Sequence, residues 1–237
     1  MWLAIDTSAD RAAVAVGDAS GPRAERSLRG ARDHAKALLP MIETVLGEAG
    51  VALDQLDGIL LADGPGSFTG LRVGASVVKA LVAARSIEVR TAPALLLLAA
   101  GALPPHAGPV LAVSDALRGE VYAAAYDVQE ATIRVLSTPT AVPAGEAAAL
   151  VAPGAALVGT APEDVLVQIA KAMGGHRLAP PASMAITLLE LLDRAGGLTS
   201  VADLGRWEPM YGRPAEAQRK WEEAHGRPLP DPAGDAG

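Results

Sequence analysis

The residues of this sequence that are best suited to chemistry lie in turns between apolar segments. Asp6, Thr7 and Ser8 form one such turn, and residues 115–120 form a second. Side chains of these types either hold a phosphate or a metal-bound water, or bond nearby backbone N–H groups in a structural Asx-type turn. The first turn contains no glycine before Gly17, which favours the structural alternative. The second is either a site or a salt-bridged hairpin corner.

A third turn, at residues 63–66, joins an apolar strand-like run (58–62) to a helix predicted from about Phe68 to Arg85. Glycine-rich turns before a helix N-terminus commonly hold anions, because unpaired N–H groups point outward there. The spacing G-x-G-x-x-x-G from Gly64 to Gly70 is one residue longer than the dinucleotide fingerprint, and no Gly-Lys-Ser/Thr follows. These glycines therefore either bind an anion or only permit tight turns and close packing.

The residue inventory does not favour metal or thiol chemistry. There is no cysteine, and none of the four histidines has a neighbour at metal-ligand spacing: Leu38 stands one helical turn after His34. We expect His34 to be a polar residue at a helix N-terminus, and His106, His176 and His225 to be exposed in loops. We predict neither a metal nor a cofactor.

Length and composition limit the classes of protein. The 237 residues suit two modest domains or one large one. A net charge of −7 disfavours a protein that grips nucleic acid by itself, because phosphate contacts need clustered Lys and Arg. Asp6 comes too early for a signal peptide, and the apolar runs are too short to cross a membrane. We therefore expect a soluble cytoplasmic protein.

The helix after the glycine-rich turn has two apolar faces at about 100° per residue. The first contains three glycines and three other apolar residues: Gly66, Gly70, Gly74, Val77, Leu81 and Ala84. The second contains Leu71, Ala75, Val78 and Val82, and a polar strip contains Arg72, Ser76 and Lys79. Two apolar faces imply two burials, one against the chain's own sheet and one against a partner. The alternative is that both faces are buried inside one domain.

The predicted elements follow one order twice, on either side of a Gly- and Pro-rich boundary at 101–109. Strands at 2–5, 12–17 and 22–27 precede a helix at 34–49. After the boundary, strands are predicted at 110–113, 121–126, 133–137 and 156–158. We predict an N-terminal lobe (1–102), a C-terminal lobe (108–215) and a tail (216–237) that forms a short helix at 215–225 and is disordered from 228.

A duplicated β-β-β-α-β-α unit, with a polar turn in each first hairpin, is the plan of the actin-like ATPase (ASKHA) fold, an α/β fold with two lobes. Four stretches of this sequence closely resemble the bacterial TsaB family, also called YeaZ. They are AIDTS (4–8), HAKALLP (34–40), DGPGSFTGLRVG (63–74) and DALRGEVY (115–122). The resemblance is strong over roughly residues 1–130 and weaker beyond them.

The resemblance implies a non-catalytic subunit of the machinery that places threonylcarbamoyl on N6 of adenosine 37 in tRNAs reading codons that begin with A. It implies pairing with the catalytic paralogue TsaD through a helix bundle that includes the helices at 34–49 and 68–85. A small ATPase, TsaE, joins the pair, and tRNA is met only through the complex. Alone, the chain is expected to form a homodimer through the same helices.

We therefore predict partner contacts at eight positions on or beside the two helices: Leu38, Leu39, Ile42, Gly66, Gly70, Gly74, Val77 and Leu81. Asp6, Thr7 and Ser8 are kept as a vestigial phosphate site, and no catalytic residue is predicted. The alternative function is a catalytically competent ATPase or kinase of the same fold. A metallopeptidase, a label once attached to relatives of this family, is disfavoured by the missing metal ligands.

Overall fold

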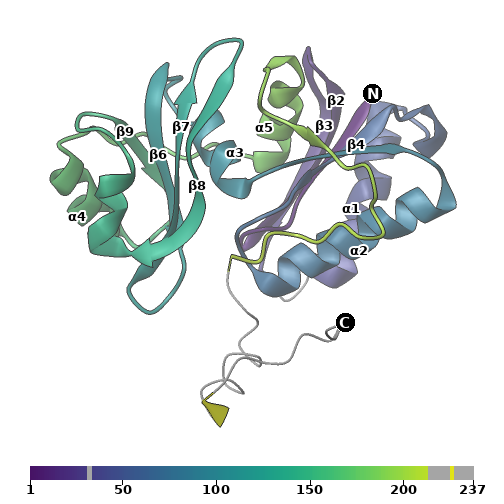
Figure 1. The fold of residues 1–237 in the computed structure, drawn as a ribbon. Coiled ribbons are helices and arrows are strands. Elements are labelled where there is room, and N and C mark those ends of the chain that lie inside the picture. Colours follow the sequence, from purple (N-terminus) through teal and green to yellow (C-terminus); the bar gives the residue numbers. More distant parts are fainter. Residues whose placement is uncertain (31–33, 213–224, 227–237) are drawn as a thin grey trace.

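The computed structural model describes residues 1–30, 34–212 and 225–226. The first two ranges form two lobes, each built on one β-sheet (Figure 1). The first sheet has six strands in the order β10-β5-β4-β1-β2-β3, and the second has four in the order β8-β7-β6-β9. The first sheet contains β1 (Trp2–Asp6), β2 (Arg11–Asp18), β3 (Gly21–Arg29), β4 (Gly58–Ala62), β5 (Glu88–Ala92) and β10 (Thr199–Ser200). The second contains β6 (Gly108–Asp115), β7 (Glu120–Val128), β8 (Ile133–Pro143) and β9 (Ala156–Gly159).

The two sheets repeat one pattern of pairing. β1 is antiparallel to β2 and parallel to β4, just as β6 is antiparallel to β7 and parallel to β9. Leu3 lies opposite Ile59 in the first parallel pair, and Leu111 lies opposite Leu157 in the second. The predicted α/β fold with two actin-like lobes is thereby confirmed. One unit differs, because a 3₁₀ segment (Ala144–Leu150) follows β8 where the first lobe has a long helix.

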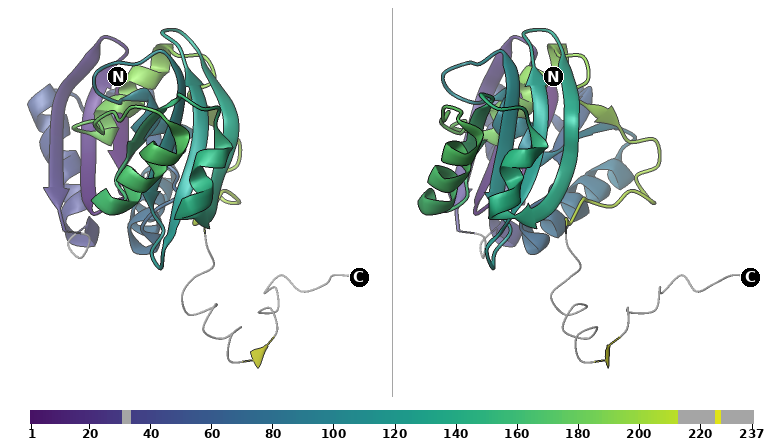
Figure 2. Two further views of the ribbon diagram at one scale, coloured as in Figure 1. Left: turned by 90° about the vertical axis from the view of Figure 1, so that its left-hand side faces the viewer. Right: turned by 60° about the vertical axis from the view of Figure 1, so that its left-hand side comes forward.

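Each helix packs on a sheet through its own apolar residues. α1 (His34–Ala49) and α2 (Phe68–Ala84) pack on one face of the first sheet, and α4 (Glu163–Met173) covers the outer face of the second (Figure 2). α3 (Ala94–Ala100) and α5 (Met184–Glu190) lie between the sheets, in a core shared by both lobes (Figure 1). α3 is apolar on all sides, which suits complete burial. Of the helices in the described ranges, none is long and apolar enough to span a membrane.

The C-terminal part of the chain corrects the predicted lobe boundary. α5 contacts β1, β2, β3 and β4, and β10 pairs antiparallel with β5, so both complete the first lobe. The predicted second lobe, 108–215, therefore ends near α4. Ala185, Leu188 and Leu189 are buried in the shared core, and this long-range contact leaves no local signal in the sequence. The predicted tail lies outside the described residues, apart from 225 and 226.

Candidate functional site

The first candidate site, the turn at residues 6–8, is a buried Asx-type turn. Oδ1 of Asp6 accepts hydrogen bonds from the backbone N–H of Ser8 at 2.9 Å and from its hydroxyl at 2.6 Å. Thr7, between them, is completely buried. In the second lobe, Asp115 accepts the backbone N–H of Leu117 at 2.7 Å in the same manner. Both aspartates therefore hold the structural hydrogen bonds of a turn.

The N-terminus of α2 packs onto the first turn. The N–H of Ser67 donates to the carbonyl oxygen of Ser8 at 2.7 Å, and the Ser67 hydroxyl accepts the N–H of Gly70. A Cβ added at Gly66 or Gly70 would overlap the carbonyl oxygen of Ser8 or Thr7, respectively. The glycines therefore permit close packing of helix against turn, which is the second of the two interpretations that the spacing left open.

This packing corrects part of the predicted partner surface. Gly66, Gly70 and Gly74 face the turn inside the first lobe, and a Cβ at Gly74 would overlap the Thr7 hydroxyl. They are therefore not free to meet a second helix. Helical periodicity shows which residues share a face, but a row of glycines admits a backbone turn as readily as a helix.

The predicted contacts on α1 divide between core and surface. Leu38 and Ile42 are buried in the core of the first lobe, so they stabilise the lobe itself. Leu39 is 49% exposed and remains on the surface. On α2, Val77 and Leu81 are partly buried against the same core. Of the predicted partner contacts, Leu39 and Val77 are thus the ones best placed to reach a partner at the surface.

The outward side of α2 forms a hollow of about 480 Å³ with the start of α1. Its lining residues are Ala35, Phe68, Thr69, Arg72, Val73, Ser76 and Val77. Of these, the sequence predicted only Val77. The polar strip on α2 could have indicated the others. Arg72 and Ser76 belong to this strip, and Phe68, Thr69 and Val73 lie beside it on the helix.

Arg72 is stacked on aromatic rings beside this hollow. Its guanidinium carbon lies 4.3 Å from the centroid of the Phe68 ring and 5.8 Å from that of Tyr211. The two ring centroids are 4.8 Å apart. The ring faces attract the cation and hold it at the surface of α2. Tyr211 follows α2 by more than a hundred residues, so no local sequence pattern predicts this contact.

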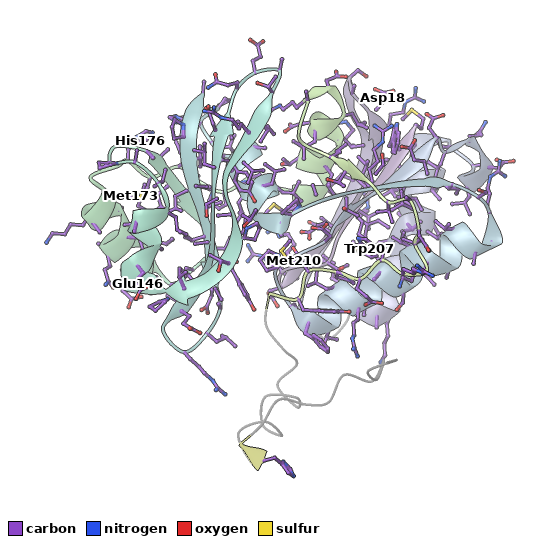
Figure 3. All side chains as sticks on the ribbon, in the orientation of Figure 1. Asp18, Glu146, Met173, His176, Trp207 and Met210 are labelled. Carbon is purple, nitrogen blue, oxygen red and sulfur yellow. The ribbon has the colours of Figure 1, made fainter. Side chains whose placement is uncertain are left out.

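Tyr211 belongs to a C-terminal segment, residues 201–212, that runs along α2 (Figure 3, near the labelled Trp207 and Met210). The N–H of Met210 donates to the carbonyl oxygen of Asp63 at 2.7 Å, and Lys79 of α2 pairs with Glu208 at 3.3 Å. Trp207 packs against the core of the first lobe. A second hollow, of about 330 Å³, lies between α2 and this segment. The segment is therefore part of the α2 surface.

Asp63 and Tyr126 place two polar groups with few hydrogen bonds in the interior between the lobes. Burial raises the pKa of Asp63 to about 6, against an opposing hydrogen bond with Thr91. Burial, and then the nearby Asp63, raise the pKa of the Tyr126 phenol. Among the described residues, neither Oδ1 of Asp63 nor the Tyr126 hydroxyl has a hydrogen-bond partner. Sequence reasoning missed this pair, because it forms between the residue that follows β4 in one lobe and a residue of β7 in the other.

A cleft of about 580 Å³ lies between the lobes, lined by both hairpin turns. Ser8 and Asp10 line it from the first lobe, and Ser114, Asp115 and Leu117 line it from the second. The structure therefore brings together the two polar turns that the sequence singled out, although Asp6 and Thr7 themselves are buried.

The histidines do not assemble into a metal centre in the part of the chain that the structure describes, where no group of three or more His, Cys, Asp or Glu side chains is placed to hold an ion. His106 and His176, predicted as separate loop residues, have ring centroids 5.3 Å apart in an edge-to-face arrangement. His176 and His225 are exposed, whereas His106 is half-buried.

Comparisons with known proteins agree with the family resemblance of the sequence. A family model described as "TsaD: tRNA N6-adenosine threonylcarbamoyltransferase" matches residues 29–179. The chain is 37% identical over 121 residues to a protein of Haemophilus influenzae named tRNA threonylcarbamoyladenosine biosynthesis protein TsaB, and 34% identical over 129 residues to the Escherichia coli protein of the same name. These alignments cover 51% and 54% of this chain, and 51% and 55% of the relatives. The chain therefore spans about half the length of the curated relatives it matches.

A solved structure extends the similarity over most of the fold. YeaZ from Pseudomonas aeruginosa superposes with a TM-score of 0.67 and 30% sequence identity, covering 80% of this chain and 89% of that chain.

Proposed function

Because the chain belongs to the TsaB/YeaZ family, we propose that it acts in the synthesis of tRNA threonylcarbamoyladenosine as a non-catalytic subunit of the transferase. Its partner is a TsaD-like catalytic subunit, which modifies adenosine 37 of tRNAs reading codons that begin with A. A TsaE-like ATPase joins the pair, and the chain meets tRNA only within this complex.

The closed first turn is the observation that supports a non-catalytic role. Its carboxylate is bonded to Ser8, and the Ser8 carbonyl oxygen is bonded to Ser67 of the α2 N-terminus. A phosphate approaching this turn would have to displace hydrogen bonds that also hold α2 on its sheet. Such buried bonds are costly to leave unmade.

The exposed surface of α2 supports a protein partner. Phe68 and Arg72 border an apolar hollow, and Leu39 lies one helical turn after Ala35, which lines the same hollow. Aromatic residues and arginine are enriched in protein interfaces. We assign the partner contact to Leu39, Phe68, Arg72, Val73 and Val77, and this surface no longer includes the three glycines of α2.

Reconstitution from purified proteins tests the proposal. The modified adenosine should form only when the chain and its catalytic partner are both present. Product formed by this chain alone, or undiminished product when it is omitted, would contradict the accessory role.

Titration calorimetry separates this role from that of an active ATPase or kinase. The isolated chain should show no turnover with ATP and Mg²⁺. Micromolar binding accompanied by hydrolysis or phosphoryl transfer would instead favour the enzyme.

A further inference from the structure

Two arginines stand opposite each other beside the cleft between the lobes. Arg11 begins β2 and Arg29 ends β3, and the antiparallel pairing makes them direct partners. Side chains in that position have Cβ atoms about 5 Å apart, so like charges repel each other. Nη1 of Arg11 donates to the carbonyl oxygen of Ala182 at 3.1 Å. Among the carboxylates that the structure describes, none forms an ion pair with either arginine.

Both arginines line the cleft of about 580 Å³ and also an adjoining hollow of about 280 Å³. Thr160 and Met184 line both spaces as well, so the two spaces adjoin along one wall. Small-molecule sites commonly measure roughly 300–1,000 Å³. The cleft therefore has room for a metabolite-sized ligand with the arginine pair at its edge.

Three carboxylates line the same spaces, and each has another partner. Asp6 accepts both donors of Ser8, and Asp115 accepts the N–H of Leu117. Asp10 also has an interaction partner. None of these carboxylates forms an ion pair with Arg11 or Arg29 among the described residues, so a bound anion would supply the direct contact that the two guanidinium groups lack.

The remaining wall of the cleft is apolar, with one unused polar atom. Leu95 and Leu98 of α3 line it from the side of the shared core, and Leu117 lines it from the second hairpin. The hydroxyl of Ser114, which also lines the cleft, is buried and has no hydrogen-bond partner among the residues that the structure describes. Buried polar atoms are nearly always paired, so this hydroxyl is available to a bound ligand.

The second hairpin turn is held in an unfavourable conformation beside this wall. Leu117 and Arg118 have φ values of 63° and 59°, in the left-handed region that non-glycine residues seldom adopt. Leu117 is also 67% exposed. Strain of this kind gathers at ligand sites, where it fixes a side chain in a required position. Here it keeps an apolar side chain at the edge of the cleft.

We propose that the cleft binds a small organic anion, whose phosphate or carboxylate lies on Arg11 and Arg29 and whose apolar body lies against Leu95, Leu98 and Leu117. Such a site needs no partner subunit and no catalysis by this chain. It therefore goes beyond the accessory role, and its failure would leave that role untouched.

Titration of the isolated full chain with four probes at low ionic strength tests the chemistry. Phenyl phosphate and benzoate combine an anion with a flat apolar body, inorganic phosphate is the anion alone, and benzyl alcohol is the body alone. At least one of the first two should bind more tightly than both inorganic phosphate and benzyl alcohol, and the better of them identifies the head group. Equal or weaker binding of both organic anions would overturn the proposal.

Matched charge removals locate the site. Arg29→Gln should weaken binding of the better probe about 10-fold or more, because hydrogen bonds to charged groups are the stronger class. Arg23→Gln removes the same charge from the same strand outside the cleft, and should change the affinity less than twofold. Melting temperatures verify that both variants are folded. Equal losses in the two variants, or no loss in Arg29→Gln, would refute the assignment.

Discussion

Asp63 couples protonation to stability at the point where β4 meets the C-terminal segment. Its carbonyl oxygen accepts the N–H of Met210, while burial raises the pKa of its carboxyl from 3.8 to about 6. Between those values the folded chain keeps a proton that the unfolded chain releases. The stabilisation from the protonated form is therefore complete below pH 3.8 and is lost as the pH rises to about 6.

We predict that Asp63→Asn removes this loss. The wild-type free energy of unfolding should fall by up to about 3 kcal/mol across the window, at about 1.4 kcal/mol per tenfold change in the protonation equilibrium. The variant should be the more stable protein at pH 7, and the difference should shrink towards pH 4. Urea unfolding at a series of pH values measures it, with Asp193→Asn at an exposed position as control. An unchanged pH profile in Asp63→Asn would contradict the prediction.

At the scale of an element, the contact of α2 with the first turn depends on missing side chains. Gly70→Ala places a Cβ against the carbonyl oxygen of Thr7, so the helix or the turn must shift. We expect a loss of about 1–3 kcal/mol in the free energy of unfolding, typical of overpacking.

Gly47→Ala in α1 is the matched control, because a Cβ at that exposed helical position meets nothing within 4 Å. It should stabilise the protein by about 0.5–1 kcal/mol, through the better helix propensity of alanine. Denaturant unfolding of both variants measures the contrast. Equal effects would mean that the glycines of α2 are not needed for close packing.

The proposed partner surface gives a second prediction at this scale. Leu39→Glu should weaken binding to the catalytic subunit on the order of 100-fold, because a carboxylate would be desolvated without a counter-charge. Val167→Glu on α4 is the control, since Val167 is 51% exposed and Leu39 is 49% exposed. Both variants should melt near the wild-type temperature. Equal affinity of both variants for the catalytic subunit would mean that the partner does not contact Leu39 of α1.

Elements were more predictable than the contacts between them. The helix at 34–49 and the strand at 58–62 have the predicted bounds, because apolar periodicity and flanking turn residues are local signals. The stack of Arg72 on Tyr211 and the pair of Asp63 with Tyr126 join segments far apart in sequence. Which apolar residues meet which segment depends on the three-dimensional arrangement, so the prediction that Gly66, Gly70 and Gly74 meet a partner was wrong.

At the scale of the whole molecule, the surface over α1 and α2 predicts self-association. Leu39 and the neighbouring hollow leave apolar area exposed in the monomer, and a two-fold dimer would bury it on both copies. Light scattering should show a dimer at about 100 μM, because a dissociation constant of that size needs an association free energy of only about −5.5 kcal/mol. Leu39→Glu should shift it towards monomer and Val167→Glu should not. A wild-type monomer at that concentration would contradict the prediction.

The return of α5 and β10 to the first sheet makes the second lobe an insertion within the first. During synthesis, β1 to β5 leave the ribosome early, yet the buried side chains of α5 follow only after the whole inserted lobe. Neither lobe can then reach its final burial before the other, although N-terminal domains usually fold first. The shared core that results should make the lobes unfold together, as one cooperative unit.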